Sequence, residues 1–189
     1  ARRTLANRSM AEAVTYSFLS SQHALLFGGG KDELKLMNPI SSDLDEMRPS
    51  IIPNLISSAL KNSNMGNSDI AIFEVGPQYA DASAEGQQVV AAGIRTGQTA
   101  ARHWSNVSRS VDVFDVKGDV VALLEVLGVP VANLQTSVDA PNWYHPGRSG
   151  VLRLGPNALA YFGEIHPTVL RAMNAVSYTH LTLPTKVTV

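Results

Sequence analysis

A helical pattern of apolar residues begins shortly after residue 48 and is followed by a glycine at residue 66. Spacings of one, three and four residues place these apolar positions along one side of a helix. Gly66 supplies a stop, so the pattern predicts a packed helix over residues 53–64. The residues of its apolar side are Ile51, Ile52, Leu55, Ile56, Ala59 and Leu60.

Period-two alternation of apolar and polar residues predicts strands on both sides of this helix. Gly155-Pro156-Asn157 has the composition of a hairpin turn between the last two strands. Strands outnumber helices and neighbouring strands are joined by short turns, so we predict an α+β fold in which helices flank an antiparallel sheet. The predicted strands and extended runs cover residues 12–19, 69–79, 88–95, 111–116, 150–154 and 158–164.

Three further helices are predicted from residues that are typical of helix N-termini. Ser20 or Ser21 caps a short helix that runs to Leu26, and Asp115 caps a longer one that runs to Leu127. Pro167 takes the first position of a last helix over residues 168–174. After residue 175 the content of Ser, Thr and Pro rises. We therefore predict one domain over residues 1–175 and a non-native or disordered tail over 176–189, with a genuine terminal strand as the alternative.

Composition narrows the functional classes. The net charge of −1 gives no electrostatic reason to expect nucleic-acid binding, and the lack of cysteine excludes disulfides and thiolate metal sites. No apolar run has the length needed to span a bilayer and no signal peptide is visible, so we expect a cytoplasmic protein without membrane contact. Because the chain begins Ala1-Arg2-Arg3, without an initiator Met, we expect a fragment or a processed product.

Two groups of polar residues near the end of the chain are candidates for chemistry. His145-Pro146-Gly147-Arg148 predicts a tight turn that either binds an anion or is structural, with Arg148 paired to a carboxylate. Glu164 and His166 share one face of a strand end. They form an acid/base pair or half of a metal site, or they cap the following helix and tie down the loop. We favour the structural interpretation in both cases.

Arg48 is the third candidate, because it follows the acidic residues Asp43, Asp45 and Glu46 and precedes the apolar helix. It either contacts a phosphate or carboxylate of a partner, or it forms a local ion pair with those acids. The chain lacks both a dinucleotide-binding glycine loop and a Gly-x-Ser-x-Gly elbow. From the residues alone, no active site is assembled.

Several motifs in order resemble the β subunit of bacterial phenylalanine–tRNA ligase, over residues 1 to about 175. Asn38 and Pro39 open the first of them, and each motif is weak alone but strong in register with the others. The main motifs are Asn38-Pro39-Ile40-Ser41, Met47-Arg48-Pro49-Ser50 and Pro53-Asn54-Leu55-Ile56. The supporting motifs are Glu12-Ala13-Val14-Thr15-Tyr16-Ser17-Phe18, Phe73-Glu74-Val75-Gly76, Asp115-Val116-Lys117-Gly118-Asp119, His145-Pro146-Gly147-Arg148-Ser149 and Gly163-Glu164-Ile165-His166-Pro167.

The resemblance implies a truncated class II synthetase-like core that is catalytically silent. In that family the core packs on a catalytic α subunit within an (αβ)2 heterotetramer, the α subunit uses ATP and Mg, and other parts of the complex make most contacts with tRNA. An active core has an ATP-binding arginine after the strand that corresponds to residues 73–79, whereas this chain continues Ala80-Asp81-Ala82. The resemblance therefore implies no catalytic, cofactor or metal residue in this chain.

The resemblance also implies that the helix over residues 53–64 and the next strand form the subunit interface. The interface residues predicted on this basis are Arg48, Pro49, Leu55, Ile56, Ala59 and Leu60. Two alternative functions stay open: an enzyme domain that binds a nucleotide or an amino acid, with Arg48, His145, Arg148 or Glu164 as ligands, and a tRNA-contacting module.

Overall fold

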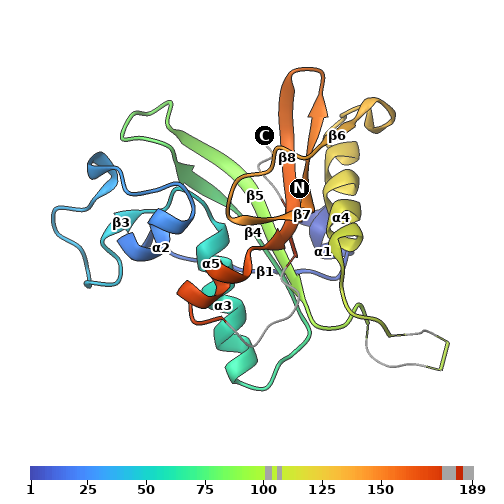
Figure 1. Ribbon diagram of the computed structural model, residues 1–189, viewed down its shortest axis with the longest axis horizontal. Coiled ribbons are helices and arrows are strands. Elements are labelled where there is room, and N and C mark those ends of the chain that lie inside the picture. Colours follow the sequence, from blue (N-terminus) through green and yellow to red (C-terminus); the bar gives the residue numbers. More distant parts are fainter. Residues whose placement is uncertain (101–103, 106–107, 176–181, 185–189) are drawn as a thin grey trace.

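The protein is described here by a computed structural model that covers residues 1–100, 104–105, 108–175 and 182–184. Its main feature is a seven-stranded sheet in which β1 pairs parallel to β4 and all other neighbours pair antiparallel (Figure 1). The order across this sheet is β1 (Ala11–Glu12), β4 (Ile70–Tyr79), β5 (Gln87–Thr96), β9 (Thr182–Pro184), β8 (Asn157–Ile165), β7 (Tyr144–Leu154) and β6 (Gln135–Ser137). The predicted α+β class, an antiparallel sheet flanked by helices, is confirmed.

Helices cover both faces of the sheet and divide the core into two clusters (Figure 1). The first cluster packs α3 and α5 against residues such as Val90 and Ile94, whereas the second packs α1 and α4 against Phe73 and Phe162. The two faces alternate along each strand because successive side chains point to opposite sides. The helices are α1 (Arg2–Asn7), α2 (Ser21–Leu26), α3 (Ile52–Asn64), α4 (Val113–Val126) and α5 (Pro167–Ala172), with short 3-10 turns at Asp32–Leu34 and Val131–Asn133.

The predicted helix over residues 53–64 is α3, and it begins one residue earlier than predicted. Its apolar side lies in the first core cluster, where Leu55, Ile56 and Ala59 are fully buried against the sheet. Each large side chain buried in this way contributes about 1.5–3 kcal/mol relative to an exposed position. This helix therefore holds one face of the sheet together.

The start of α4 differs from the prediction by three residues. Asp112, not Asp115, is the N-cap, and its carboxylate accepts hydrogen bonds from the backbone N–H groups of Phe114 and Asp115. In turn, the carboxylate of Asp115 accepts a hydrogen bond from the backbone N–H of Asp112 (2.9 Å), which completes a capping box. The extended run predicted over residues 111–116 is therefore wrong from Val113 onward, where the helix begins.

The strand predicted over residues 12–19 is interrupted. Only Ala11–Glu12 joins the main sheet, and Phe18–Leu19 forms a separate two-stranded sheet with β3 (Glu46–Met47). Of the intervening residues, Ala13 still donates its N–H to the carbonyl of Phe73 on β4 (2.7 Å), and residues 15–17 are held by the contacts described below. The hairpin turn at Gly155-Pro156 and the cap of α2 by Ser20 are confirmed.

The predicted tail contains one described element. Residues 182–184 form β9 between β5 and β8, with Thr182 opposite Arg95 and Leu183 opposite Gly163. These three residues form a strand, whereas the non-native origin of the tail stays a prediction. The rest of the predicted tail, residues 176–181 and 185–189, lies outside the described residues.

Candidate functional site: a groove beside α3

An open groove of about 930 Å³ lies on the outer side of α3. Its walls come from three segments that lie far apart in sequence: the chain before and within α2, the loop before β3, and the outward face of α3. The lining residues are Val14, Thr15, Tyr16, Phe18, Leu19, Ser20, Ser21, Gln22, His23, Ser42, Asp43, Leu44, Asp45, Pro53, Asn54, Ser57, Ser58 and Lys61.

Arg48 fixes the wall formed by residues 15–17. Its Nη1 donates to Thr15 Oγ1 (2.9 Å) and to the carbonyl of Tyr16 (3.3 Å), and its backbone N–H donates to the carbonyl of Ser17 (3.0 Å). Its Nη2 pairs with Glu74 (2.9 Å), whose other oxygen accepts from the Thr15 hydroxyl (2.6 Å). The guanidinium therefore replaces a neighbouring strand as the hydrogen-bond partner of this segment.

Both alternatives considered for Arg48 are wrong. The side chain is only 1% exposed, so it cannot reach a partner molecule, and its carboxylate partner is Glu74 on β4 rather than the acids that precede it in sequence. Among those acids, Asp45 instead accepts from the backbone N–H and the hydroxyl of Ser21 (2.7 and 2.6 Å). The Ser21 hydroxyl, followed by its backbone N–H, holds the pKa of the Asp45 carboxyl below its usual range.

Asn54 on α3 fixes the same wall from the other side. Its side-chain amide donates to the carbonyls of Tyr16 (3.0 Å) and Phe18 (3.3 Å). With the backbone held in this way, the side chains of Val14 and Tyr16 point away from the core and are 90% and 68% exposed. Large apolar side chains displayed on a fixed backbone next to a groove are typical of contact surfaces.

The groove is electrostatically mixed, with an acidic bias. Asp43 and Asp45 line one part of it, and Lys61 is the cation among its lining residues. Burial lowers the pKa of His23, against the opposing effect of the Asp43 carboxylate. This charge distribution does not favour a polyanionic ligand.

The predicted interface residues on α3 are corrected by these positions. Leu55, Ile56 and Ala59 are buried in the chain's own core, and Leu60 and Pro49 are half-buried. The apolar side of α3 is needed to cover the sheet, so any partner must contact its opposite face. Sequence reasoning missed Val14 and Tyr16, whose alternation with Phe18 indicated a strand without showing which side would stay exposed.

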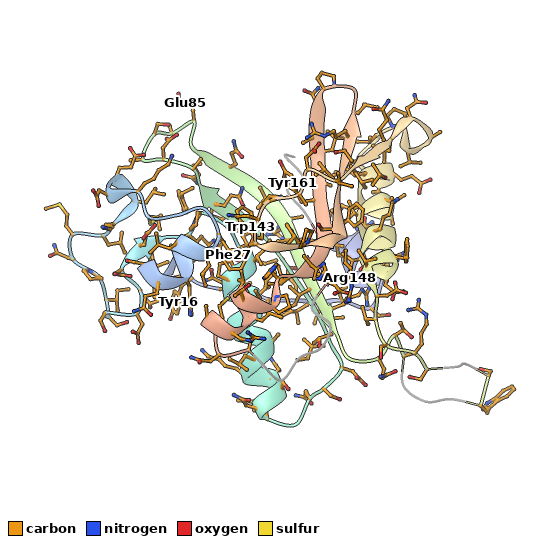
Figure 2. All side chains as sticks on the ribbon, viewed as in Figure 1. Tyr16, Phe27, Glu85, Trp143, Arg148 and Tyr161 are labelled. Carbon is orange, nitrogen blue, oxygen red and sulfur yellow. The ribbon has the colours of Figure 1, made fainter. Side chains whose placement is uncertain are left out.

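The second predicted group lies at the paired ends of β7 and β8. Residues 145–148 form a bulge in β7 rather than a tight turn, and they stand opposite Glu164 in the ladder. Arg148 pairs with Glu164 (2.8 Å), and His166 caps α5 by accepting from the N–H of Thr168 (3.2 Å). The ion pair of Arg148 and the helix cap by His166 that the structural interpretation expects are thus both present, and neither contact decides whether the group also binds an anion. Tyr16 and Arg148 lie well apart in Figure 2, so this group is separate from the groove.

The remaining candidates have no site around them. Asn38 and Pro39 are exposed in the loop between residues 35 and 45. In the described part of the chain, no group of three or more His, Asp or Glu side chains is arranged to hold a metal ion. Nor, within those same residues, does any helix combine the length and apolar character needed to cross a membrane.

Comparison with solved structures places the fold in a known class. The chain is similar to a pyrrolysyl-tRNA synthetase from Desulfitobacterium hafniense, with a TM-score of 0.69 and 12% identity. The match covers 99% of this chain and 61% of that one. The chain therefore shares its fold with part of an aminoacyl-tRNA synthetase.

Sequence comparison identifies the particular family. Residues 1–179 match the family described as "Phenylalanyl tRNA synthetase beta chain CLM domain", and the chain belongs to this family. It is 55% identical over 173 residues to the phenylalanine–tRNA ligase beta subunit of Rhodospirillum rubrum, and 49% identical over 179 residues to that of Brucella abortus. Each match covers 92% of this chain but only 22% of the relative.

Proposed function

We propose that this chain is a non-catalytic, class II synthetase-type core of a phenylalanine–tRNA ligase beta subunit, and that it packs on the catalytic alpha subunit. The proposal includes the (αβ)2 assembly in the cytoplasm, with ATP and Mg²⁺ used by the alpha subunit. Family membership and the names of the relatives support the subunit assignment. The pairing of most described arginine side chains with carboxylates supports the non-catalytic assignment.

Phosphoryl and adenylyl chemistry requires cations aimed at the phosphates. In this chain most described guanidinium groups are already engaged by carboxylates, and the groove is lined by no arginine. A triphosphate in the groove would meet Asp43 and Asp45 with Lys61 as the balancing cation. The arginines in ion pairs are Arg2, Arg8, Arg48, Arg95, Arg109, Arg148 and Arg153.

The groove is better suited to a protein surface. It combines the exposed side chains of Val14 and Tyr16 with polar groups on the outward face of α3, such as Asn54, Ser57 and Lys61. An apolar centre with a polar rim is the usual anatomy of a subunit interface. We therefore place the contact with the alpha subunit here, and not on the buried side of α3.

Co-expression with the alpha subunit from the Rhodospirillum rubrum relative tests this assignment. We expect a stable complex, and we expect Val14→Asp with Tyr16→Asp to weaken it at least about tenfold, because both side chains would leave an apolar contact. Val138→Asp is the matched control, because Val138 is 80% exposed and does not line the groove. Equal losses from the control and the groove variant would rule out this surface.

Calorimetry with ATP and with phenylalanine tests the enzyme alternative. We expect no heat of binding from the chain alone, because no arginine lines the groove, and the two arginines that line a smaller pocket, Arg8 and Arg95, are both paired with Asp119. Tight binding of either ligand would contradict the non-catalytic assignment and favour an enzyme domain.

A further inference from the structure

We propose that His145, His166 and Arg148 form a binding site for one phosphate group of an RNA backbone. The choice of tRNA as the source of that phosphate rests on the proposed function, whereas the anion site itself does not. The site belongs to the ends of β7 and β8, away from the groove, and it uses the two motifs that subunit packing leaves unexplained.

The bulge in β7 places the Arg148 side chain against Glu164 and the ring of His145 against that of His166, which follows Glu164 by two residues. Four residues, 145–148, stand opposite Glu164 alone, between the pairs Tyr144–Ile165 and Ser149–Gly163. The Ser149 hydroxyl closes the bulge by donating to the carbonyl of His145 (2.7 Å). Bulges of this kind re-aim side chains and are common beside functional sites. Here the result is that the rings of His145 and His166 stack, with centroids 6.2 Å apart and an interplanar angle of 26°.

Backbone hydrogen bonds fix which nitrogen of each ring carries the proton. Nδ1 of His145 accepts from the N–H of Gly147 (3.1 Å), and Nδ1 of His166 accepts from the N–H of Thr168 (3.2 Å). A nitrogen that accepts carries no proton, so each ring has its N–H at Nε2. Among the described residues neither Nε2 has a hydrogen-bond partner, so the stacked pair presents two donors without an acceptor.

Arg148 supplies the charge. Its side chain is 55% exposed, and Nη1 is held by Glu164 (2.8 Å). This ion pair orients the guanidinium and leaves its Nε and Nη2 donors unused by any described residue. Donors on a guanidinium and two imidazoles match the oxygens of a phosphate, whose charge-assisted hydrogen bonds are about 2.7–2.9 Å long. Because Glu164 offsets the charge of Arg148, we expect this site to bind phosphate weakly and to be one of several contacts with the RNA backbone.

Nuclear magnetic resonance of the imidazole nitrogens in the full chain tests the site at constant ionic strength. Inorganic phosphate is titrated first, and tRNA is titrated separately. We expect the Nε2 signals of His145 and His166 to shift with both ligands, and the midpoint for tRNA to be at least about tenfold lower because neighbouring phosphates add contacts. His23 lines the groove and is the internal reference, whose signal stays unchanged.

Two variants are expected to act in opposite directions, which a merely structural role would not produce. Arg148→Gln raises both midpoints about fivefold, because it removes a charged donor. Glu164→Gln lowers them about threefold, because it removes a competing carboxylate. Arg2→Gln, which alters an exposed arginine paired with Glu12, is the control and leaves both midpoints unchanged. Thermal unfolding of every variant checks that the fold is intact.

Each result decides the matter. Unchanged His145 and His166 signals in both titrations would overturn the site, and shifts with phosphate but not with tRNA would overturn the RNA assignment. Shifts with both ligands and the two opposite variant effects would support it. A failure to bind the alpha subunit would refute the proposed function while leaving these shifts intact, so the two proposals are tested separately.

Discussion

Two clusters of charged side chains lie on opposite faces of the sheet, and they differ in the number of ion-pair partners. One arginine pairs with one carboxylate in the first, whereas two arginines pair with one carboxylate in the second. The Arg48 cluster consists of Arg48, Glu74 and Thr15, and both of its charged side chains are at most 5% exposed. The Asp119 cluster consists of Asp119, Arg8 and Arg95. Its carboxylate is 1% exposed, but its arginines are 38% and 14% exposed.

The Arg48 cluster has no substitute for either charged member. The guanidinium of Arg48 donates to the carbonyls of Pro77 and Tyr16 and to the Thr15 hydroxyl, and it pairs with Glu74. One side chain therefore connects β4 to the groove wall. In the Asp119 cluster two arginines bind one carboxylate, and Arg95 also donates to the carbonyl of Arg8 (2.7 Å). Losing one arginine there leaves the other in place. The comparison indicates that burial and the lack of a second partner decide how much an ion pair matters.

The largest expected effect comes from Arg48→Met. It leaves Glu74 buried without a counter-charge, and we expect a loss of about 3–5 kcal/mol in the free energy of unfolding. Arg8→Met, the equivalent change in the other cluster, is expected to cost less than about 1 kcal/mol, because Arg8 is 38% exposed and Arg95 remains. Urea denaturation of both variants gives the measurement.

A double variant separates the charge from the packing. Arg48→Met with Glu74→Leu removes both charges together, so we expect it to recover more than half of the loss. If the double variant is as unstable as Arg48→Met alone, the cost lies in the lost backbone contacts and the comparison of the two clusters fails.

A smaller effect is expected from Asp119→Asn, which removes the shared carboxylate. Both arginines lose their counter-charge, but water reaches them more easily than it reaches Arg48, so we expect a loss of about 2–3 kcal/mol. The loss should shrink when Arg8→Gln is added, because one unpaired charge disappears. Urea denaturation checks both values, and a loss greater than that of Arg48→Met would reverse the ranking.

The sequence predicted those parts of the fold whose causes are local. Periodicity located α3 to within one residue, and Gly155-Pro156 located the hairpin turn. The cap of α4 was misplaced because Asp112 and Asp115 both suit an N-cap, and the capping box in fact uses both. Local composition cannot rank two candidates that share one motif.

The groove was beyond local reasoning because its causes are long-range. Arg48 forms its ion pair with Glu74, which lies 26 residues later in the chain, and not with the acidic residues just before it in the sequence. Arg48 and Asn54 both donate to the backbone carbonyl of Tyr16, and the side chains of Tyr16 and the nearby Val14 stay exposed. The apolar side of α3 was located correctly, but whether it meets a partner or the chain's own sheet depends on β5 and β8, which lie more than 20 residues away, as well as on the neighbouring β4.

The smallest expected effects come from two glycines, each beside an arginine of one cluster. A Cβ added at Gly76 would lie 2.8 Å from Arg48 Nη2 and 3.1 Å from Glu74 Oε1, in a place where neither can move freely. We expect Gly76→Ala to lower the free energy of unfolding by about 1–2 kcal/mol through overpacking. A Cβ at Gly118 in α4 would lie 3.4 Å from Arg8 Nη2, an ordinary contact with a half-exposed side chain.

Gly118→Ala is therefore expected to raise the free energy of unfolding by about 0.5–1 kcal/mol, because alanine is the better residue inside a helix. The same methyl group thus stabilises the protein beside the Asp119 cluster and destabilises it beside the Arg48 cluster. Urea denaturation of the two variants side by side measures this difference in sign. If both variants change the free energy of unfolding in the same direction, the comparison of the two clusters fails. That result would mean that the Arg48 side chain can move away from a methyl group at residue 76 as easily as Arg8 can move away from one at residue 118.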